Sequence, residues 1–265
     1  MTAAEGSVPS GRPRYLDVVR DLAAAQKAKA AGAPPYSIHV NRPAGRLIAA
    51  AAFRAGLTPN AVTAISAVFT FSGIALIAFV PPTWWLGVLT WLLLAVGYAF
   101  DSADGQLARL RGGGSFAGEW LDHVIDCVKI SSLHLAVLIT AYLHFGLPSA
   151  ALLLVPLVFA IIAAAEFFTM ILNDQLKRVA AAGTRTPPAT SGGRRSLLRS
   201  VLLAPTDYGI LCLIFLTLGA PPVFFVIYSL MFLGNLGHFA LALVKWFGDM
   251  RALDAAKSAE ARSAR

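Results

Sequence analysis

The stretch from Asp101 to Asp126 reads D-S-A-D-G-Q-L-A-R-L-R-G-G-G-S-F-A-G-E-W-L-D-H-V-I-D. It lies between hydrophobic runs of membrane-spanning length, yet it carries four aspartates: Asp101, Asp104, Asp122 and Asp126. Ionised aspartate is costly in or near lipid, so aspartates at such positions are candidates for function. Four carboxylates close together also require compensating positive charge, and divalent cations are the obvious source.

The composition is that of an integral membrane protein. Of the 265 residues, 57% are hydrophobic and 14% are charged, whereas a soluble domain carries roughly 25% charged residues. The hydrophobic pattern is nearly unbroken from Pro59 to Phe247. It predicts one membrane domain at residues 59–248, preceded by a cytoplasmic or interfacial arm (1–58) and followed by a short cytoplasmic tail (249–265).

Spanning a bilayer as a helix takes about 20 apolar residues. Six segments meet or nearly meet this length: Pro59–Val80, Trp84–Arg109, Phe116–Phe145, Ala150–Leu172, Tyr208–Gly219 with the residues before it, and Val223–Trp246. The fifth is the shortest. The sequence therefore predicts an all-α integral membrane protein with six transmembrane helices.

Lys and Arg gather in the N-terminal arm, in the connections after the second and fourth predicted spans, and in the tail. Because cytoplasmic loops are enriched in these residues, we expect a multi-pass protein of the cell membrane with both termini in the cytoplasm. The net charge of +8 then reflects topology and a rim that attracts anionic lipids or phosphorylated substrates, and no nucleic acid partner is expected. Two amphipathic segments of the arm, Tyr15–Ala31 and Asn41–Gly56, are expected to lie on the membrane surface.

The acidic motif has helical spacing. Residues three and four apart share a helix face, so Asp101 and Asp104 face the same way near the end of the second span, and so do Asp122 and Asp126 in the third. The glycine-rich turn between the spans makes them antiparallel neighbours. Asp126 lies about ten residues inside its helix, or ~15 Å from the end, which predicts a cavity open to the cytoplasm.

Oxygen-only ligands suit Mg²⁺, Mn²⁺ or Ca²⁺, and the absence of a Cys/His cluster argues against zinc. Four aspartates can hold two ions, and a two-metal site stabilises the attacking and leaving oxygens of a phosphoryl-type displacement. Gly105 and Ala108 leave room for a ligand to approach the backbone, and Arg109 offers a fork suited to phosphate oxygens. The local chemistry thus suggests a metal-bound diphosphate at the cytoplasmic face.

The pattern D-x-x-D-G-x-x-A-R-x8-G-x-x-x-D-x-x-x-D resembles the signature of the CDP-alcohol phosphotransferase family. Every specified position is matched, in order by Asp101, Asp104, Gly105, Ala108, Arg109, Gly118, Asp122 and Asp126. Such a pattern is far more specific than a short glycine-rich string. The stretch Leu57–Thr63 (L-T-P-N-A-V-T) is similar to the lead-in to the family's first membrane helix, and the likeness covers roughly Asn41 to Trp246.

The resemblance implies a reaction in which an alcohol attacks a CDP-linked donor and CMP leaves. It implies that Asp101, Asp104 and Asp122 hold metal, Mg²⁺ or Mn²⁺ as two ions. Asp126 would be both a ligand and the general base. The residues implied at the CDP site are Gly105, Ala108, Arg109 and Gly118, with Asn60 and Thr63 from the lead-in. The preferred donor is CDP-diacylglycerol, and the family likeness also implies a homodimer.

The acceptor is left open by the sequence. Lys129 lies one turn beyond Asp126 and could bind a phosphate on the acceptor or balance the acidic cluster. Glu166, inside an apolar run, could face a substrate cavity. Arg178 and Arg199 could also hold an acceptor phosphate. However, Asp126 is followed by cysteine, where several phosphatidylinositol-phosphate-type relatives carry arginine.

Two other functions remain alternatives. The same metal site would serve an enzyme that transfers a headgroup from a soluble CDP-alcohol to diacylglycerol. Acidic residues in membrane helices also suit a divalent-cation channel or transporter. Transport sites tend to lie between structural repeats, and no repeat is visible in this sequence.

Overall fold

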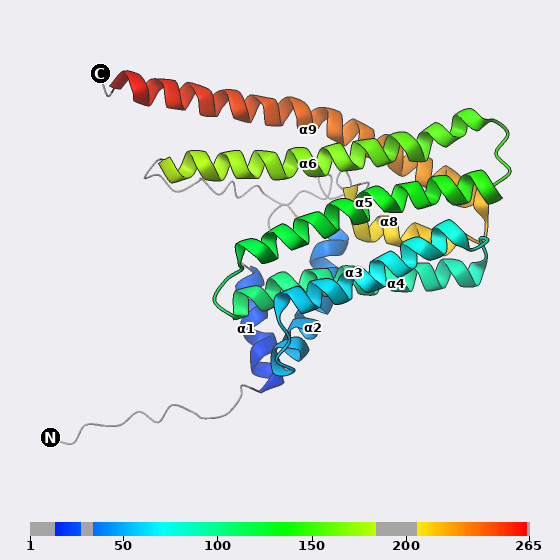
Figure 1. The fold of residues 1–265 in the computed structure, drawn as a ribbon, viewed down its shortest axis with the longest axis horizontal. Coiled ribbons are helices and arrows are strands. Elements are labelled where there is room, and N and C mark those ends of the chain that lie inside the picture. The colour runs from blue at the N-terminus through cyan, green and yellow to red at the C-terminus, as the bar shows by residue number, and fades with distance from the viewer. Residues whose placement is uncertain (1–13, 28–33, 184–205, 264–265) are drawn as a thin grey trace.

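The computed structural model describes residues 14–27, 34–183 and 206–263. These residues form helices and connecting turns, without a strand. Five of their helices are long and apolar enough to cross a membrane: α3 (Pro59–Phe79), α4 (Trp84–Leu110), α5 (Phe116–His144), α6 (Leu154–Gly183) and α9 (Pro221–Ser263). Figure 1 shows them side by side as an elongated bundle. The predicted all-α integral membrane fold is confirmed.

Within the described residues, the helix at the predicted fifth span is too short to cross the thickness of a bilayer. It consists of α8 (Tyr208–Ile214) and a 3-10 turn (Phe215–Thr217), and the residues predicted to lengthen it, 184–205, lie outside the described part. Within the described residues, five helices are long and apolar enough to span a membrane and this apolar one is shorter, where the sequence predicted six spans.

Short polar side chains set where the helices begin. Thr58, Thr83 and Ser115 each precede a spanning helix, and each side-chain oxygen accepts a hydrogen bond from the backbone N–H three residues later, at 3.0–3.2 Å. Such caps satisfy N–H groups that have no partner within the helix. Between α4 and α5 the chain reverses through Gly112 and Gly113, whose φ angles of +92° and +132° favour glycine.

Small residues let the helices that carry the site approach closely. A Cβ atom at Gly97 of α4 would collide with the Thr70 side chain of α3, and the Ser66 hydroxyl donates to the Gly97 carbonyl at 2.8 Å. This packing of small residues is typical of membrane helices. The contact fixes α3 against α4 about one helical turn before Asp101, the first aspartate of the acidic motif.

The N-terminal arm packs on the bundle end that carries the motif. It contains α1 (Tyr15–Lys27), a π-helical turn (Ser37–Asn41) and α2 (Arg42–Arg54). Their buried apolar side chains form one cluster with the ends of α3 and α4: Val18, Leu22, Ala49, Ala50, Ala52, Val62, Ala103 and Leu107. The expected amphipathic helices are therefore present, and their apolar faces contact protein, while Leu16 and Leu47 stay exposed.

The last helix is much longer than the predicted span Val223–Trp246. α9 runs without a break to Ser263, and Figure 1 shows it extending beyond the bundle beside the end of α6. An ion pair of 2.7 Å between Lys177 and Asp249 joins these two extensions. The helix thus continues across residue 248, and the division of the chain into arm, membrane domain and tail stays a prediction.

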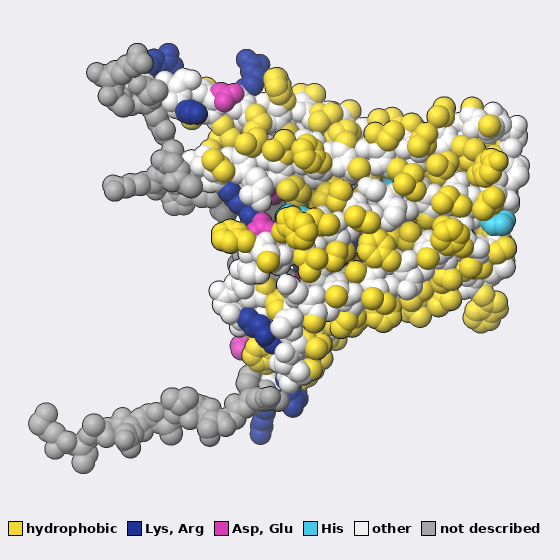
Figure 2. Space-filling model, in the orientation of Figure 1, with side chains coloured by type: hydrophobic (Ala, Val, Ile, Leu, Met, Phe, Trp, Pro, Cys, Tyr) yellow, Lys and Arg dark blue, Asp and Glu magenta, His cyan; other side chains and the backbone are white. Residues whose placement is uncertain are grey.

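The surface separates into two zones. Figure 2 shows hydrophobic side chains over the spanning region, and Lys and Arg at the end where the N-terminal helices lie. This distribution agrees with the basic rim expected from the sequence. The orientation of the chain in the membrane stays a prediction.

Candidate active site

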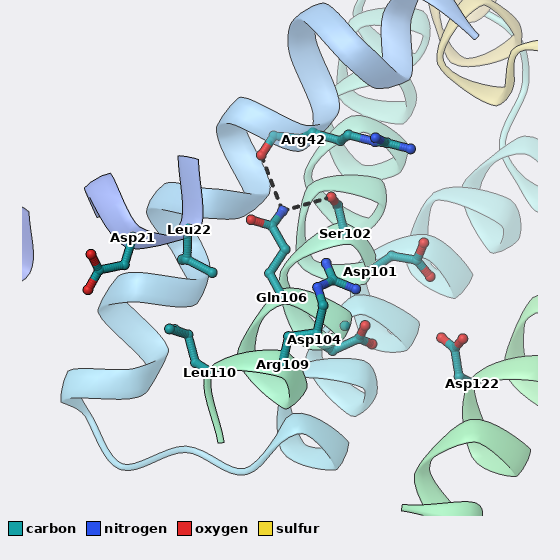
Figure 3. Close-up of a pocket in the computed structure, with 11 residues that line it drawn as sticks. Asp21, Leu22, Arg42, Asp101, Ser102, Asp104, Gln106, Arg109, Leu110 and Asp122 are labelled. Atoms are coloured by element: carbon teal, nitrogen blue, oxygen red, sulfur yellow. Dashed lines mark hydrogen bonds between the residues drawn. The ribbon is translucent and has the colours of Figure 1, made fainter. Parts of the chain in front are cut away.

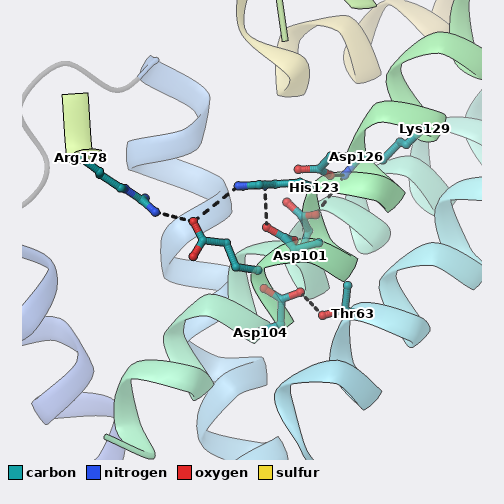
Figure 4. A network of polar contacts seen from close by, with 9 residues as sticks. Thr63, Asp101, Asp104, His123, Asp126, Lys129 and Arg178 are labelled. Atoms are coloured by element: carbon teal, nitrogen blue, oxygen red, sulfur yellow. Dashed lines mark hydrogen bonds and ion pairs between the residues drawn. The ribbon is translucent and has the colours of Figure 1, made fainter. Parts of the chain in front are cut away.

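Three of the four motif aspartates converge between α4 and α5. One carboxylate oxygen each from Asp101, Asp122 and Asp126 lies within 4.8 Å of the other two. Figure 4 shows Asp101 and Asp126 facing one another from neighbouring helices. Asp101 and Asp126 each lie about ten residues from the nearer helix end, or ~15 Å along the axis. The antiparallel pairing predicted from the sequence is what brings these side chains together.

Asp104 points toward α3. Its Oδ2 accepts a hydrogen bond of 2.6 Å from the Thr63 hydroxyl, and the residue is 7% exposed. A hydrogen bond of this kind fixes the direction of a carboxylate and leaves its other oxygen for a ligand. Asp104 also lines one pocket with Asp101 and Asp122, so all four aspartates border the same region.

The carboxylate cluster fits a hard divalent cation. Asp101, Asp122 and Asp126 supply only oxygen ligands, which suit Mg²⁺ or Mn²⁺. Like charges packed this closely repel one another unless cations lie between them. The cluster is also half-buried, which strengthens both the repulsion and the attraction for a cation.

Lys129 already supplies one positive charge to this cluster. Its Nζ lies 3.0 Å from Asp101 Oδ1 and 2.5 Å from Asp126 Oδ1, and the residue is only 5% exposed. The ammonium also lies 5.6 Å from the centre of the Tyr208 ring. Of the two roles considered from the sequence, this contact supports charge balance, because the ammonium is engaged by two carboxylates.

A pocket of about 400 Å³ opens beside the aspartates. Figure 3 shows Arg109 and the acidic side chains of Asp101, Asp104 and Asp122 around it. Gly105 belongs to the same wall. A Cβ atom built at Gly105 would lie 3.6 Å from Arg109 Nη1, so the guanidinium extends across the space that the glycine leaves open. An anion in this pocket would meet both the arginine and cations held by the acids.

Two other predicted CDP-site residues, Gly118 and Asn60, meet where the start of α5 contacts α3. A Cβ atom at Gly118 would lie 3.1 Å from Asn60 Oδ1, so α3 and α5 are in close contact at this point. Ala108 is half-buried on α4 and is not part of the pocket wall. Thr63 acts through Asp104, as described above.

The predicted acceptor residues do not gather in one place. Glu166 Oε1 lies 2.9 Å from His238 Nδ1, beside a separate cavity of about 220 Å³. Arg178 pairs with Glu119 at 2.5 Å. Arg199 lies outside the described residues.

Three polar residues near the site are not among the residues that the sequence analysis predicted. His123 lies 3.8 Å from both Glu119 and Asp122, and it connects the Arg178 ion pair to the acidic cluster (Figure 4). Its position next to Asp122 was the available signal. Arg42 and Gln106 also line the pocket. Gln106 lies within the motif, whereas nothing in the sequence connected Arg42 to it.

The helical bundle and its acidic cluster define a multi-pass membrane protein with a metal-binding site. A family model for CDP-alcohol phosphatidyltransferase matches residues 56–246, and the chain belongs to that family. The match confirms the resemblance found in the sequence. It makes the protein a membrane transferase of phospholipid biosynthesis.

A comparison with curated protein sequences finds no match. Among solved structures, the chain is similar to a Mycobacterium tuberculosis phosphatidylinositol phosphate synthase (PgsA1) in complex with manganese and citrate, with 22% identity, 76% of this chain and 87% of that chain covered, and a TM-score of 0.46. The same enzyme with CDP-DAG bound gives 21% identity, coverages of 78% and 94%, and a TM-score of 0.47. At these TM-scores the family assignment rests on the family match alone.

Proposed function

We propose that the protein transfers a phosphatidyl group from CDP-diacylglycerol to an alcohol acceptor and releases CMP. The convergence of Asp101, Asp122 and Asp126 within 4.8 Å carries this proposal. A cluster of oxygen ligands beside an arginine-lined pocket suits a metal-bound diphosphate. The cluster lies ~15 Å inside the helices, at a depth that a lipid donor reaches with its acyl chains still in the bilayer.

Asp101, Asp104, Asp122 and Asp126 would hold Mg²⁺ or Mn²⁺, as two ions. Bound there, the metal would neutralise phosphate charge and stabilise the entering and leaving oxygens. Thr63 fixes the orientation of Asp104 through its hydrogen bond. Lys129 compensates the negative charge of Asp101 and Asp126.

Asp126 is the proposed general base. The acceptor hydroxyl oxygen forms a bond to the phosphorus remote from cytidine, and its proton passes to the Asp126 carboxylate. The bond between that phosphorus and the bridging oxygen breaks, and its electron pair leaves with CMP. Arg109 and the backbone at Gly105 and Gly118 bind the CDP portion, with Asn60, Thr63 and Ala108 contributing to the shape of the site.

The acceptor residues, the assembly and the topology are part of the same proposal. Glu166 lines a cavity whose wall is mainly apolar and would contact the acceptor, while Arg178, Arg199 and, in addition to its charge-balancing role, Lys129 are candidates for an acceptor phosphate. The protein is proposed to act as a homodimer in the cell membrane with both termini in the cytoplasm.

The test uses the full-length protein in liposomes that contain radiolabelled CDP-diacylglycerol and Mg²⁺. CMP release is measured with polyols, phosphorylated polyols and amino alcohols as acceptors. Asp126→Asn should keep CDP binding and lose about 10²- to 10⁴-fold in turnover, the usual value of general-base help. Asp254→Asn, an exposed aspartate on α9, is the matched control and should behave as the wild type.

Each alternative gives a different result. CMP release from CDP-ethanolamine and diacylglycerol, with none from CDP-diacylglycerol, would show that the donor is a soluble CDP-alcohol and the acceptor is diacylglycerol. Entry of Mn²⁺ into vesicles without CMP from any donor would favour a channel or transporter. A wild-type rate for Asp126→Asn would remove this residue from the role of base.

A further inference from the structure

Arg42 brings a second guanidinium to the pocket from outside the acidic motif. It is the first residue of α2, and it lines the pocket together with Arg109 of α4. Figure 3 shows the Arg42 side chain reaching from α2 over the same side of the pocket as Asp101. The N-terminal arm therefore supplies part of the wall of a site whose other charged groups come mainly from α4 and α5.

The backbone of Arg42 is fixed by the motif itself. Gln106 Nε2 donates to the Arg42 carbonyl oxygen and to the Ser102 hydroxyl, each at 3.2 Å, and Gln106 is 1% exposed. A Cβ atom at Gly45, one turn further along α2, would lie 2.8 Å from Ser102, so α2 lies directly on α4. Because the backbone is already ordered, Arg42 loses less entropy on binding a ligand than an arginine on a loose segment would.

The charges around the pocket favour an anion with more than one phosphate. Arg42 and Arg109 line the same pocket, and like charges that share a partly buried site repel one another. The facing acids, Asp101, Asp104 and Asp122, would be neutralised by divalent cations, and the remaining acid of the wall, Asp21 of α1, is solvent-exposed. An anion between the two arginines would relieve their repulsion, and arginine binds phosphate oxygens through two parallel hydrogen bonds.

We propose that Arg42 binds the diphosphate of the CDP-linked donor jointly with Arg109. This inference rests on the proposed function, and it deepens it by assigning a donor-binding residue to the N-terminal arm. The two arginines contact the non-bridging oxygens of the diphosphate from α2 and α4. Donor binding thereby connects the arm to the helices that carry the aspartates.

The test measures the binding of CDP by titration calorimetry, using the full-length protein in detergent with millimolar Mn²⁺. Arg42→Gln should weaken CDP binding by roughly 10- to 100-fold, the value of a charged hydrogen bond, and raise KM for the donor more than it lowers kcat. Arg42→Lys should recover part of this loss, because lysine keeps the charge without the fork. Cytidine, which has no phosphate, should bind equally to all three proteins.

Arg54→Gln, an exposed arginine at the other end of α2, is the control and should bind CDP as the wild type does. Thermal unfolding of each variant shows whether it is folded, and Arg42→Lys carries the test if Arg42→Gln is not. CDP affinity within twofold of the wild type in a folded Arg42→Gln would overturn the role of Arg42 and leave the proposed function standing. Failure of the wild type to bind CDP or release CMP would overturn both.

Discussion

Replacing Lys129 with methionine should destabilise the metal-free protein. The Lys129 side chain is 6% exposed, and its partners Asp101 and Asp126 are 20% and 21% exposed. Removing one member of a buried ion pair costs about 3–5 kcal/mol, and partial exposure of the acids favours the lower end, about 3 kcal/mol. For a chain of this size 1 kcal/mol corresponds to about 2–4 °C in melting temperature, so the expected loss is roughly 6–12 °C.

Divalent cations should reverse much of this loss. Mn²⁺ and the Lys129 ammonium compete for the same carboxylates, so the variant should bind the ion more tightly and gain more stability from it. The assay is thermal unfolding in detergent, followed by circular dichroism, in EDTA and in millimolar Mn²⁺. The melting temperature of the methionine variant should rise by several degrees more than that of the wild type on addition of Mn²⁺.

The matched control is Lys177→Met. Lys177 also forms a 2.7 Å ion pair, with Asp249, but their side chains are 43% and 31% exposed, and exposed pairs contribute up to about 1 kcal/mol. Its melting temperature should change little and should not depend on the metal. The reasoning about Lys129 is refuted if Lys129→Met melts with the wild type in EDTA, or if Mn²⁺ stabilises both proteins equally.

Two further predictions concern packing. Gly97→Ala should lower the free energy of unfolding by about 1–3 kcal/mol, because the new Cβ atom meets Thr70 and overpacking costs this amount. The control is Gly237→Ala, whose new Cβ atom meets open space. Equal melting temperatures for the two variants would contradict the close packing of α3 on α4. Asp207→Ala should loosen the attachment of the N-terminal arm, because the Asp207 carboxylate accepts hydrogen bonds from the backbone N–H of Tyr36 (2.7 Å) and Gly209 (3.0 Å). The backbone N–H groups left unpaired should cost about 1–3 kcal/mol of stability. Limited proteolysis should therefore cleave the arm faster in this variant, and an unchanged cleavage rate would show that the contact does not hold the arm.

The convergence of the aspartates could be predicted because it follows from local rules. Helical spacing placed each pair on one face, and the glycine-rich turn made the two helices antiparallel. The contact between Thr63 and Asp104 joins residues 41 apart in sequence, and the contact between Arg42 and Gln106 joins residues 64 apart. Such contacts depend on how α2 and α3 pack against α4, and no periodicity reports that.

Hydropathy predicted the positions of the long helices better than their ends. The sixth predicted span stops at Trp246, one residue before the hydrophobic pattern ends, yet α9 continues to Ser263. Residues after Trp246 are rich in alanine and charged side chains, which favour helix without favouring lipid. Hydropathy therefore reports where a helix leaves the bilayer, and helix propensity decides where it ends.

Asp101 and Asp126 lie ~15 Å along their helices from the nearer ends, so the proposed lipid donor meets them by lateral diffusion within its own leaflet. Encounters between enzyme and donor are then two-dimensional. Turnover should follow the mole fraction of donor among the surrounding lipids, and adding buffer to the vesicles should leave the rate per enzyme molecule unchanged. Mixing in an inert phospholipid should slow the reaction even at constant total donor.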